Sequence, residues 1–293
     1  MMHDALIVGG SFAGISAALQ LARARRRIAV VDAGWRRNRF AEASHGFLGQ
    51  DGRAPGDIVR EARAQLAAYP NVSWHDGLAA EARRQGEGFE VDVGGATLRA
   101  RRLVLATGVV DELPPVEGLA ERWGRTVFHC PYCHGYELNE GAIGVLASSP
   151  LSMHHALMLP DWGPTTFLLN GAFEPDEEQT RALAARGVAV EAVPVARITD
   201  EMTVELVDGR RLPLAGLFTA TRTRMASPLA EQLGCEFEQG PAGPYLRRTM
   251  METTVRGAFA CGDAAMPFAN VAIAVGDGAM TGAATHRSLI PGL

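Results

Sequence analysis

The N-terminal segment is the part of the sequence that indicates the fold most clearly. Residues 5–8, Ala-Leu-Ile-Val, form a short apolar run typical of a buried strand, and a glycine-rich turn follows at 9–14. Apolar residues then recur at helical spacing over 15–22, and a second apolar run covers 28–31. A strand, a helix and a second strand in such quick succession predict a parallel sheet covered by helices.

The turn between the first strand and the helix predicts a dinucleotide site. Gly9 permits a tight turn, and Gly14 lets the helix pack closely on the sheet. The N–H groups at the start of the helix are then free to bind a pyrophosphate. Asp32 ends the second strand, where a carboxylate accepts hydrogen bonds from a ribose hydroxyl. Ser11 replaces the middle glycine of the usual pattern, and the alternative is a glycine-rich turn with no ligand.

The rest of the chain continues as alternating strands and helices. We expect a long functional loop from Trp35 to Pro55 and a break at Pro114-Pro115, after which a second α/β unit begins. Strands are predicted at 72–74, 89–93, 102–108, 142–147, 165–169, 188–192 and 257–263, and helices at 57–68, 151–159, 175–186 and 271–287. The 293 residues are enough for two domains, each with its own core.

Composition excludes several classes of function. The net charge of -5 offers no electrostatic argument for nucleic acid binding, and no apolar run approaches the ~20 residues that span a bilayer. The N-terminus enters a strand without the features of an export signal, so we expect a cytoplasmic protein. All 28 basic residues are arginine, which excludes a lysine Schiff base and a phosphate-loop lysine.

The motif at 130–133, Cys-Pro-Tyr-Cys, followed by His134, admits four interpretations. It matches covalent c-type haem attachment, which requires export. It could bind zinc together with His129, although structural zinc sites usually spread their ligands over two separated pairs. It occurs in glutaredoxins, which are small domains with the motif near the N-terminus. The fourth interpretation is a redox thiol pair that exchanges two electrons with a bound flavin.

Four motifs together resemble bacterial-type thioredoxin reductases. They are residues 9–14, Ala106-Thr107-Gly108, residues 130–135, and Phe259-Ala260-Cys261-Gly262-Asp263, in the order seen in that family. The resemblance implies an α/β fold with two three-layer, Rossmann-like dinucleotide-binding domains and a homodimer. It implies a discontinuous FAD domain, 1–117 and 241–293, and an inserted NADPH-type domain, 118–240, that carries the cysteine motif.

Two departures separate this chain from the reductases. His134 stands where their pattern has Asp after the second cysteine. The turn at 147–152 corresponds to their glycine-rich NADPH loop, but it has no glycine, and Pro150 lacks an N–H that a phosphate could use. No basic pair follows the next strand at Asn170-Gly171-Ala172. The pyridine-nucleotide site is therefore predicted to be lost.

Both departures resemble the FAD-dependent dithiol oxidases that close disulfides in natural products such as gliotoxin, holomycin and romidepsin. This resemblance implies oxidation of a small-molecule dithiol, with O2 reduced to H2O2. It implies that Cys130 forms a mixed disulfide with the substrate and that Cys133 attacks the flavin. His134 is the candidate acid/base, because imidazole titrates near neutral pH; the alternative is a histidine that only orients its loop.

The expected FAD contacts come from segments scattered along the chain, and no metal site is expected. They are Gly9, Ser11, Phe12, Ala13, Gly14, Asp32, Ala33, His45, Ala79, Thr107, Gly108, Gly262, Asp263, Val271 and Ala272. Two other functions stay open at this stage. One is a protein-disulfide reductase that uses a donor other than NADPH, and the other is a flavin-bearing redox sensor with little turnover.

Overall fold

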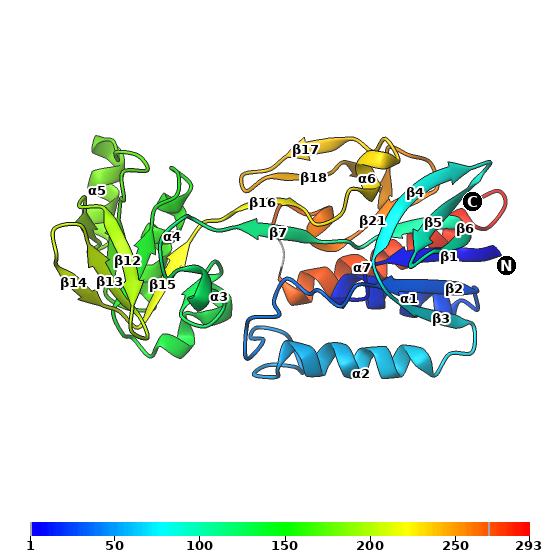
Figure 1. Cartoon of the computed structure of the whole chain (residues 1–293), viewed down its shortest axis with the longest axis horizontal. Helices are drawn as coiled ribbons and strands as arrows, with labels where there is room; N and C mark the ends of the chain where they lie inside the picture. Colours follow the sequence, from blue (N-terminus) through cyan, green and yellow to red (C-terminus); the bar gives the residue numbers. More distant parts are fainter. Residues whose placement is uncertain (1, 269) are drawn as a thin grey trace.

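The computed structural model describes residues 2–268 and 270–293, which form two α/β units joined by a narrow connection (Figure 1). The first unit is built on a sheet with the strand order β19-β20-β21-β6-β1-β2-β3. Its parallel part comes from both ends of the chain, because β21 near the C-terminus pairs with β6, and β6 pairs with β1. The elements of its N-terminal half are β1 (Met2–Val8), α1 (Phe12–Arg23), β2 (Ile28–Asp32), α2 (Pro55–Ala67) and β3 (Val72–Asp76).

An antiparallel hairpin and a C-terminal helix complete this unit. The hairpin extends from the sheet through the pairing of β5 with β6. The elements are β4 (Ala79–Gln85), β5 (Gly88–Val93), β6 (Ala96–Leu105), β19 (Arg248–Thr249), β20 (Glu252–Thr253), β21 (Ala258–Ala260), the 3-10 turn η4 (Gly262–Ala264) and α7 (Val271–Ser288).

The sheet of the first unit is buried on both faces, as a three-layer fold requires. Along β1, Ala5 and Ile7 pack into one apolar cluster with α1 and α7, while Leu6 and Val8 pack into another with β4 and β5. This alternation follows from the two-residue period of a strand. The near-continuous apolar run at 5–8 is therefore explained by burial from two sides.

The inserted unit has its own parallel sheet with the order β11-β10-β9-β15-β8. Apolar clusters cover both faces of this sheet as well. The elements are η1 (Ala120–Arg122), β8 (Val127–Phe128), α3 (Pro131–His134), η2 (Tyr136–Leu138), β9 (Ile143–Leu146), α4 (Ser152–Met158), η3 (Leu159–Asp161), β10 (Thr165–Leu168), α5 (Glu177–Ala185), β11 (Ala189–Glu191), β12 (Val195–Thr199), β13 (Thr203–Leu206), β14 (Arg211–Pro213) and β15 (Gly216–Thr219).

The connection between the units is a ribbon of two antiparallel strands, β7 (Val109–Glu112) and β16 (Arg222–Met225). After β16 the chain passes through α6 (Leu229–Gln232), β17 (Phe237–Gln239) and β18 (Pro244–Leu246). Leu229, Ala230 and Cys235 pack in a core cluster of the first unit. The boundary at Gly240 stays a prediction. Because residues that precede it pack with the first unit, we propose β16 as the end of the insertion.

The α/β fold with two Rossmann-like sheets, expected from the sequence, is confirmed. The predicted helices begin and end within about two residues of α2, α4, α5 and α7. Helix α5 starts with a capping box, in which Asp176 and Gln179 exchange side-chain and backbone hydrogen bonds. Within the described residues, no helix is long and apolar enough to cross a membrane.

Candidate active site

A cavity of about 400 Å³ lies at the carboxyl ends of the parallel strands of the first unit. Its walls come from the turn after β1, the long loop that follows β2, the segment after β6, the Gly262-Asp263 turn and the N-terminus of α7. Residues 127–129, 133 and 134 of the inserted unit also line it. Ligands of open α/β sheets bind at this edge, where the strands end.

The turn after β1 has the shape that a pyrophosphate site needs. Gly9 has φ +110°, a conformation that other residues rarely adopt. A Cβ atom on Gly14 would lie 1.8 Å from the carbonyl oxygen of Gly9, so only glycine allows this approach of α1 to the strand end. The side chain of the N-cap, Ser11, does not cap the helix, and the N–H groups of its first turn remain available.

Asp32 contacts the same turn from the end of β2. Its Oδ1 accepts hydrogen bonds from the N–H groups of Gly10 and Gly34, each at 3.2 Å. The carboxylate is therefore fixed beside the cavity that it lines. Its role as the ribose partner stays a prediction.

Most of the predicted site residues line this one cavity although they are distant in sequence. Those lining it are Gly9, Ser11, Phe12, Ala13, Asp32, Ala33, His45, Ala79, Thr107, Gly108, Cys133, His134, Gly262, Asp263 and Val271. Three others are outside its lining. Gly14 acts through helix packing, Ala272 follows Val271 in the first turn of α7, and Cys130 reaches the cavity through its bond to Cys133.

The residues present fit a dinucleotide. The buried Nε of Arg36, a lining residue, has no hydrogen-bond partner within the described part of the chain, so it is a donor left for a ligand. The N-terminus of α7, where Asn270 accepts from the N–H of Ile273, is a second helix end at the cavity. Helix N-termini favour negatively charged groups.

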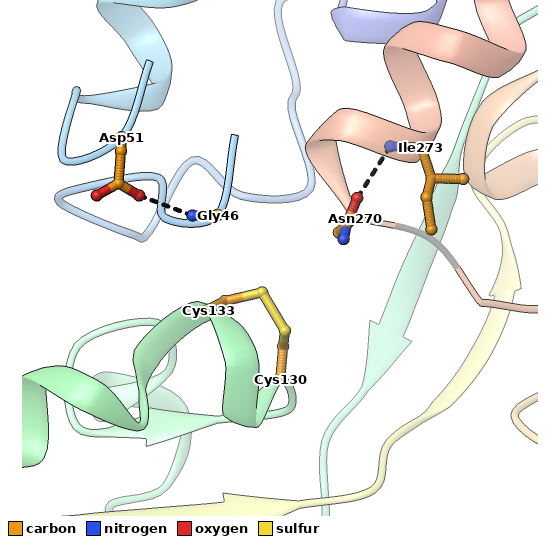
Figure 2. Close-up of a disulfide and its surroundings, with 6 residues drawn as sticks. All are labelled: Gly46, Asp51, Cys130, Cys133, Asn270 and Ile273. Carbon is orange, nitrogen blue, oxygen red and sulfur yellow. Dashed lines mark hydrogen bonds between the residues drawn. A yellow bond between two sulfur atoms is a disulfide. The ribbon is translucent and has the colours of Figure 1, made fainter. Parts of the chain in front are cut away.

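Cys130 and Cys133 form a disulfide at the start of α3, with their Cα atoms 5.3 Å apart. Figure 2 shows it facing the loop that contains Gly46 and Asp51 and the α7 terminus that contains Asn270. Cys133 lines the cavity, whereas Cys130 is not among the lining residues. The two cysteines therefore differ in position, since Cys133 lines the cavity and Cys130 reaches it through the disulfide.

His134 follows Cys133 and also lines the cavity. Its ring stacks on Phe128, with the ring centroids 4.3 Å apart and the planes 17° from parallel. Burial, together with the charge of His45, lowers the pKa of His134 to about 4. The imidazole is therefore neutral at pH 7 and can accept a proton from a thiol.

His129 is a site residue for which sequence reasoning offered only a role in zinc binding. It directly precedes Cys130, lines the cavity and stacks near Trp123. Burial, followed by the charge of Arg37, lowers the pKa of His129 to about 4, although Asp111 opposes this. Its position beside the first cysteine was the available signal. No cluster of three or more metal-ligating side chains occurs in the part of the chain that the structure describes.

The turn at 147–152 in the inserted unit is closed by its own side chains. The N–H of Ser148 donates to Oγ of Ser152 at 3.0 Å, and the hydroxyl of Ser148 donates to the carbonyl of Ala220. Asn170, at the end of the next strand, uses its side-chain oxygen to accept from the N–H of Val195 at 2.9 Å. The polar groups of Ser148 and Asn170 at this sheet edge therefore form hydrogen bonds within the protein.

Comparison with known proteins identifies the class. Residues 3–278 match the family model for pyridine nucleotide-disulphide oxidoreductases. The chain belongs to this family, in its thioredoxin-reductase-like branch, and is a flavin-dependent thiol/disulfide oxidoreductase. The match spans both units and includes the Cys130–Cys133 disulfide of the inserted unit.

Individual relatives cover nearly the whole chain. It is 32% identical to thioredoxin reductase sirT of Leptosphaeria maculans, over 97% of this chain and 94% of that protein. A solved oxidoreductase from Agrobacterium tumefaciens is 56% identical, with a TM-score of 0.96 and 98% of each chain covered. The structure of HlmI is 36% identical, with a TM-score of 0.92 over 98% of this chain and 92% of the other.

Proposed function

We propose that this protein is an FAD-dependent dithiol oxidase that closes a disulfide in a small molecule and reduces O2 to H2O2. The observation that carries the proposal is that Cys133 lines the cavity expected to hold FAD, whereas Cys130, bonded to it, is not among the lining residues. FAD bound in the cavity would supply the electron acceptor for the thiol pair and the donor to O2. The residues expected to contact FAD are part of this proposal.

The two cysteines have different roles in this reaction. A substrate thiolate attacks Cys130, the outer sulfur, and forms a mixed disulfide while Cys133 leaves as a thiolate. The second substrate thiol then attacks the substrate sulfur and releases Cys130 as a thiol. The substrate has lost two electrons and two protons, and the enzyme disulfide has gained them. Transfer of that electron pair from Cys133 restores the disulfide.

Two histidines support the proton transfers. His134 and His129 flank the cysteine motif and are both neutral at pH 7, because burial lowers the pKa of each to about 4. The neutral form accepts a proton, but a pKa well below 7 makes each histidine a weaker base than free imidazole, so the proposed role rests on the position of the ring beside the cysteines. His134, on the wall of the cavity beside Cys133, is the proposed acid/base.

The inserted unit supports an oxidase over an NADPH-dependent reductase. A pyrophosphate needs free N–H groups at a glycine-rich turn. Here the N–H of Ser148 is bonded to Ser152, and Pro150 has no N–H to offer. Asn170, at the end of β10, is bonded to the N–H of Val195, and no basic pair follows it where a reductase needs basic groups for a phosphate. These contacts favour the loss of pyridine-nucleotide binding.

Two similarities also favour the oxidase. The motif at 130–135 resembles the dithiol oxidase group, and the chain is similar to HlmI over nearly its whole length. Several relatives carry the name thioredoxin reductase, which keeps a second candidate in view. That candidate is a protein-disulfide reductase with a donor other than NADPH. A homodimer belongs to the proposal through the family resemblance alone.

The test uses the purified holoprotein under anaerobic conditions. NADPH should leave the yellow flavin spectrum unchanged for many minutes, whereas dithiothreitol should bleach it through the cysteine pair. Admitting air should restore the spectrum and release about one peroxide per dithiol, because each disulfide carries two electrons. Rapid stoichiometric bleaching by NADPH would overturn the oxidase assignment, and failure to hold FAD at all would overturn the site.

A further inference from the structure

The inserted unit is attached to the first unit by only two stretches of chain, β7 and β16 (Figure 1). Two-stranded ribbons have little independent stability and bend easily. The direction in which the disulfide faces therefore depends on side chains that fix this ribbon and the unit beyond it. Arg37, in the long loop after β2, makes such a contact.

Arg37 joins the ribbon to the flavin-side turn through two carboxylates. Its Nε and Nη2 donate to Asp111 of β7 at 2.8 and 2.6 Å, and its Nη1 donates to Asp263 at 3.0 Å. Thr221, next to β16, donates its hydroxyl to the same Asp111 at 2.8 Å. The guanidinium of Arg37 thus contacts β7 directly and is linked to the start of β16 through Asp111 and Thr221.

Asp111 is the buried member of this cluster. Side-chain exposure is 24% for Arg37 and 7% for Asp111. Burial alone would raise the pKa of Asp111, but the hydrogen bond and charge of Arg37 hold it below the ordinary value. The carboxylate therefore stays ionised, and removing one partner would leave a buried charge unpaired.

The same loop also contacts the inserted unit beyond the ribbon. A Cβ on Gly124 would lie 2.6 Å from Cβ of Phe40, so the two backbones are in close contact. His45 Nε2 lies 3.4 Å from Oε1 of Glu137, a residue of η2, which follows the redox helix α3. The loop of residues 35–46 thus meets the inserted unit at two points and the ribbon at a third.

We propose that Arg37 and Asp111 are positioning residues that hold the inserted unit with Cys133 facing the cavity, so that thiol oxidation needs no rotation of the units. An oxidase whose substrate and acceptor are both small molecules has no need to turn the disulfide away from the flavin. The proposal rests on the proposed function in one respect, namely that Cys133 is the cysteine that passes electrons to FAD.

The test measures position without turnover. In a Cys130→Ser background, the Cys133 thiolate beside FAD should give a long-wavelength charge-transfer band. Asp111→Asn should lower this band by about half or more, because the unit then populates other orientations. The band is compared per bound FAD, because Asp111 also lines the cavity, and small-angle scattering should show a larger radius of gyration. Thr221→Val, which keeps the ion pair and loses one hydrogen bond, should give a smaller change in the same direction.

A matched pair of glycine variants supplies the second arm. Gly124 and Gly171 both lie in the inserted unit at positive φ, +78° and +67°. An added Cβ meets Phe40 at Gly124 and nothing within 4 Å at Gly171. Gly124→Ala should lower the band, whereas Gly171→Ala should leave it at the parental level.

An unchanged band and scattering radius in both Asp111→Asn and Gly124→Ala would overturn the proposal. Neither measurement uses a dithiol substrate or O2, so this failure would leave the oxidase assignment intact. Conversely, NADPH could bleach the flavin and overturn the oxidase while the Asp111→Asn variant still loses its band.

Discussion

Replacing Gly14 by alanine should damage the proposed FAD site through one methyl group. The added Cβ would lie 1.8 Å from the carbonyl oxygen of Gly9, and such contacts are essentially never closer than 3.0 Å. Helix α1 would have to move outward by more than 1 Å. It has no room to do so, because Gly278 of α7 packs against the backbone of Ala13 on the other side.

The expected cost follows from overpacking. Inserting a methyl group into a tightly packed region costs about 1–3 kcal/mol, and the better helix propensity of alanine returns up to about 1 kcal/mol. For a chain of this size, a net loss of about 1–2 kcal/mol lowers the melting temperature by roughly 2–8 °C. The FAD dissociation constant should rise by about tenfold or more, because the shifted helix end no longer aims its N–H groups at the pyrophosphate.

The assay compares Gly14→Ala with Gly276→Ala in α7. An added Cβ on Gly276 meets nothing within 4 Å, so this variant should retain FAD and gain about 0.5–1 kcal/mol. Both are measured by the ratio of flavin to protein absorbance after gel filtration and by thermal unfolding. A Gly14→Ala protein with parental FAD content and melting temperature would refute the packing argument.

Three further outcomes are expected. Cys130→Ser should show a charge-transfer band that Cys133→Ser lacks, and both variants should lose dithiol turnover; a Cys130→Ser enzyme that keeps most of its activity would reverse the assignment of the two sulfurs. His134→Ala should slow turnover by about a hundredfold with FAD content unchanged, and a pH–rate profile identical to that of the parent would contradict its role as acid/base. Burial lowers the pKa of His155 from 6.5 to about 4, so the unfolded chain takes up this proton first and stability is lost as the pH falls from 6.5 towards 4. His155→Leu should reduce the loss measured between pH 7 and pH 5 by up to about 2 kcal/mol relative to the parent.

Local patterns were enough to predict the fold. The apolar run at 5–8, the glycine turn and the apolar stripe at 15–22 each depend on neighbours in sequence, and β1, the turn and α1 form as expected. The redox pair was predictable for the same reason, since Cys130 and Cys133 are three residues apart. Such signals do not depend on how distant segments pack.

Long-range contacts were not predictable in this way. Arg37 and Asp111 are 74 residues apart, and no local pattern relates them. The cavity that surrounds His129 exists only when the inserted unit meets the first unit. The sequence predicts the end of the insertion at Gly240, where the chain loosens in a hairpin turn between β17 and β18, whereas the boundary that we propose lies at β16.

The strand order of the first sheet has a consequence for synthesis of the chain. Its parallel core needs β21, and α1 buries its outer face against α7, so the N-terminal half stays incomplete until the last residues have been translated. The inserted sheet, by contrast, is built from one continuous stretch, 127–219. Domains fold as units during synthesis. The inserted unit can therefore fold on the ribosome first, while β1 and the glycine turn wait with exposed apolar faces, and a nascent chain stopped before α7 is a substrate for chaperones and proteases.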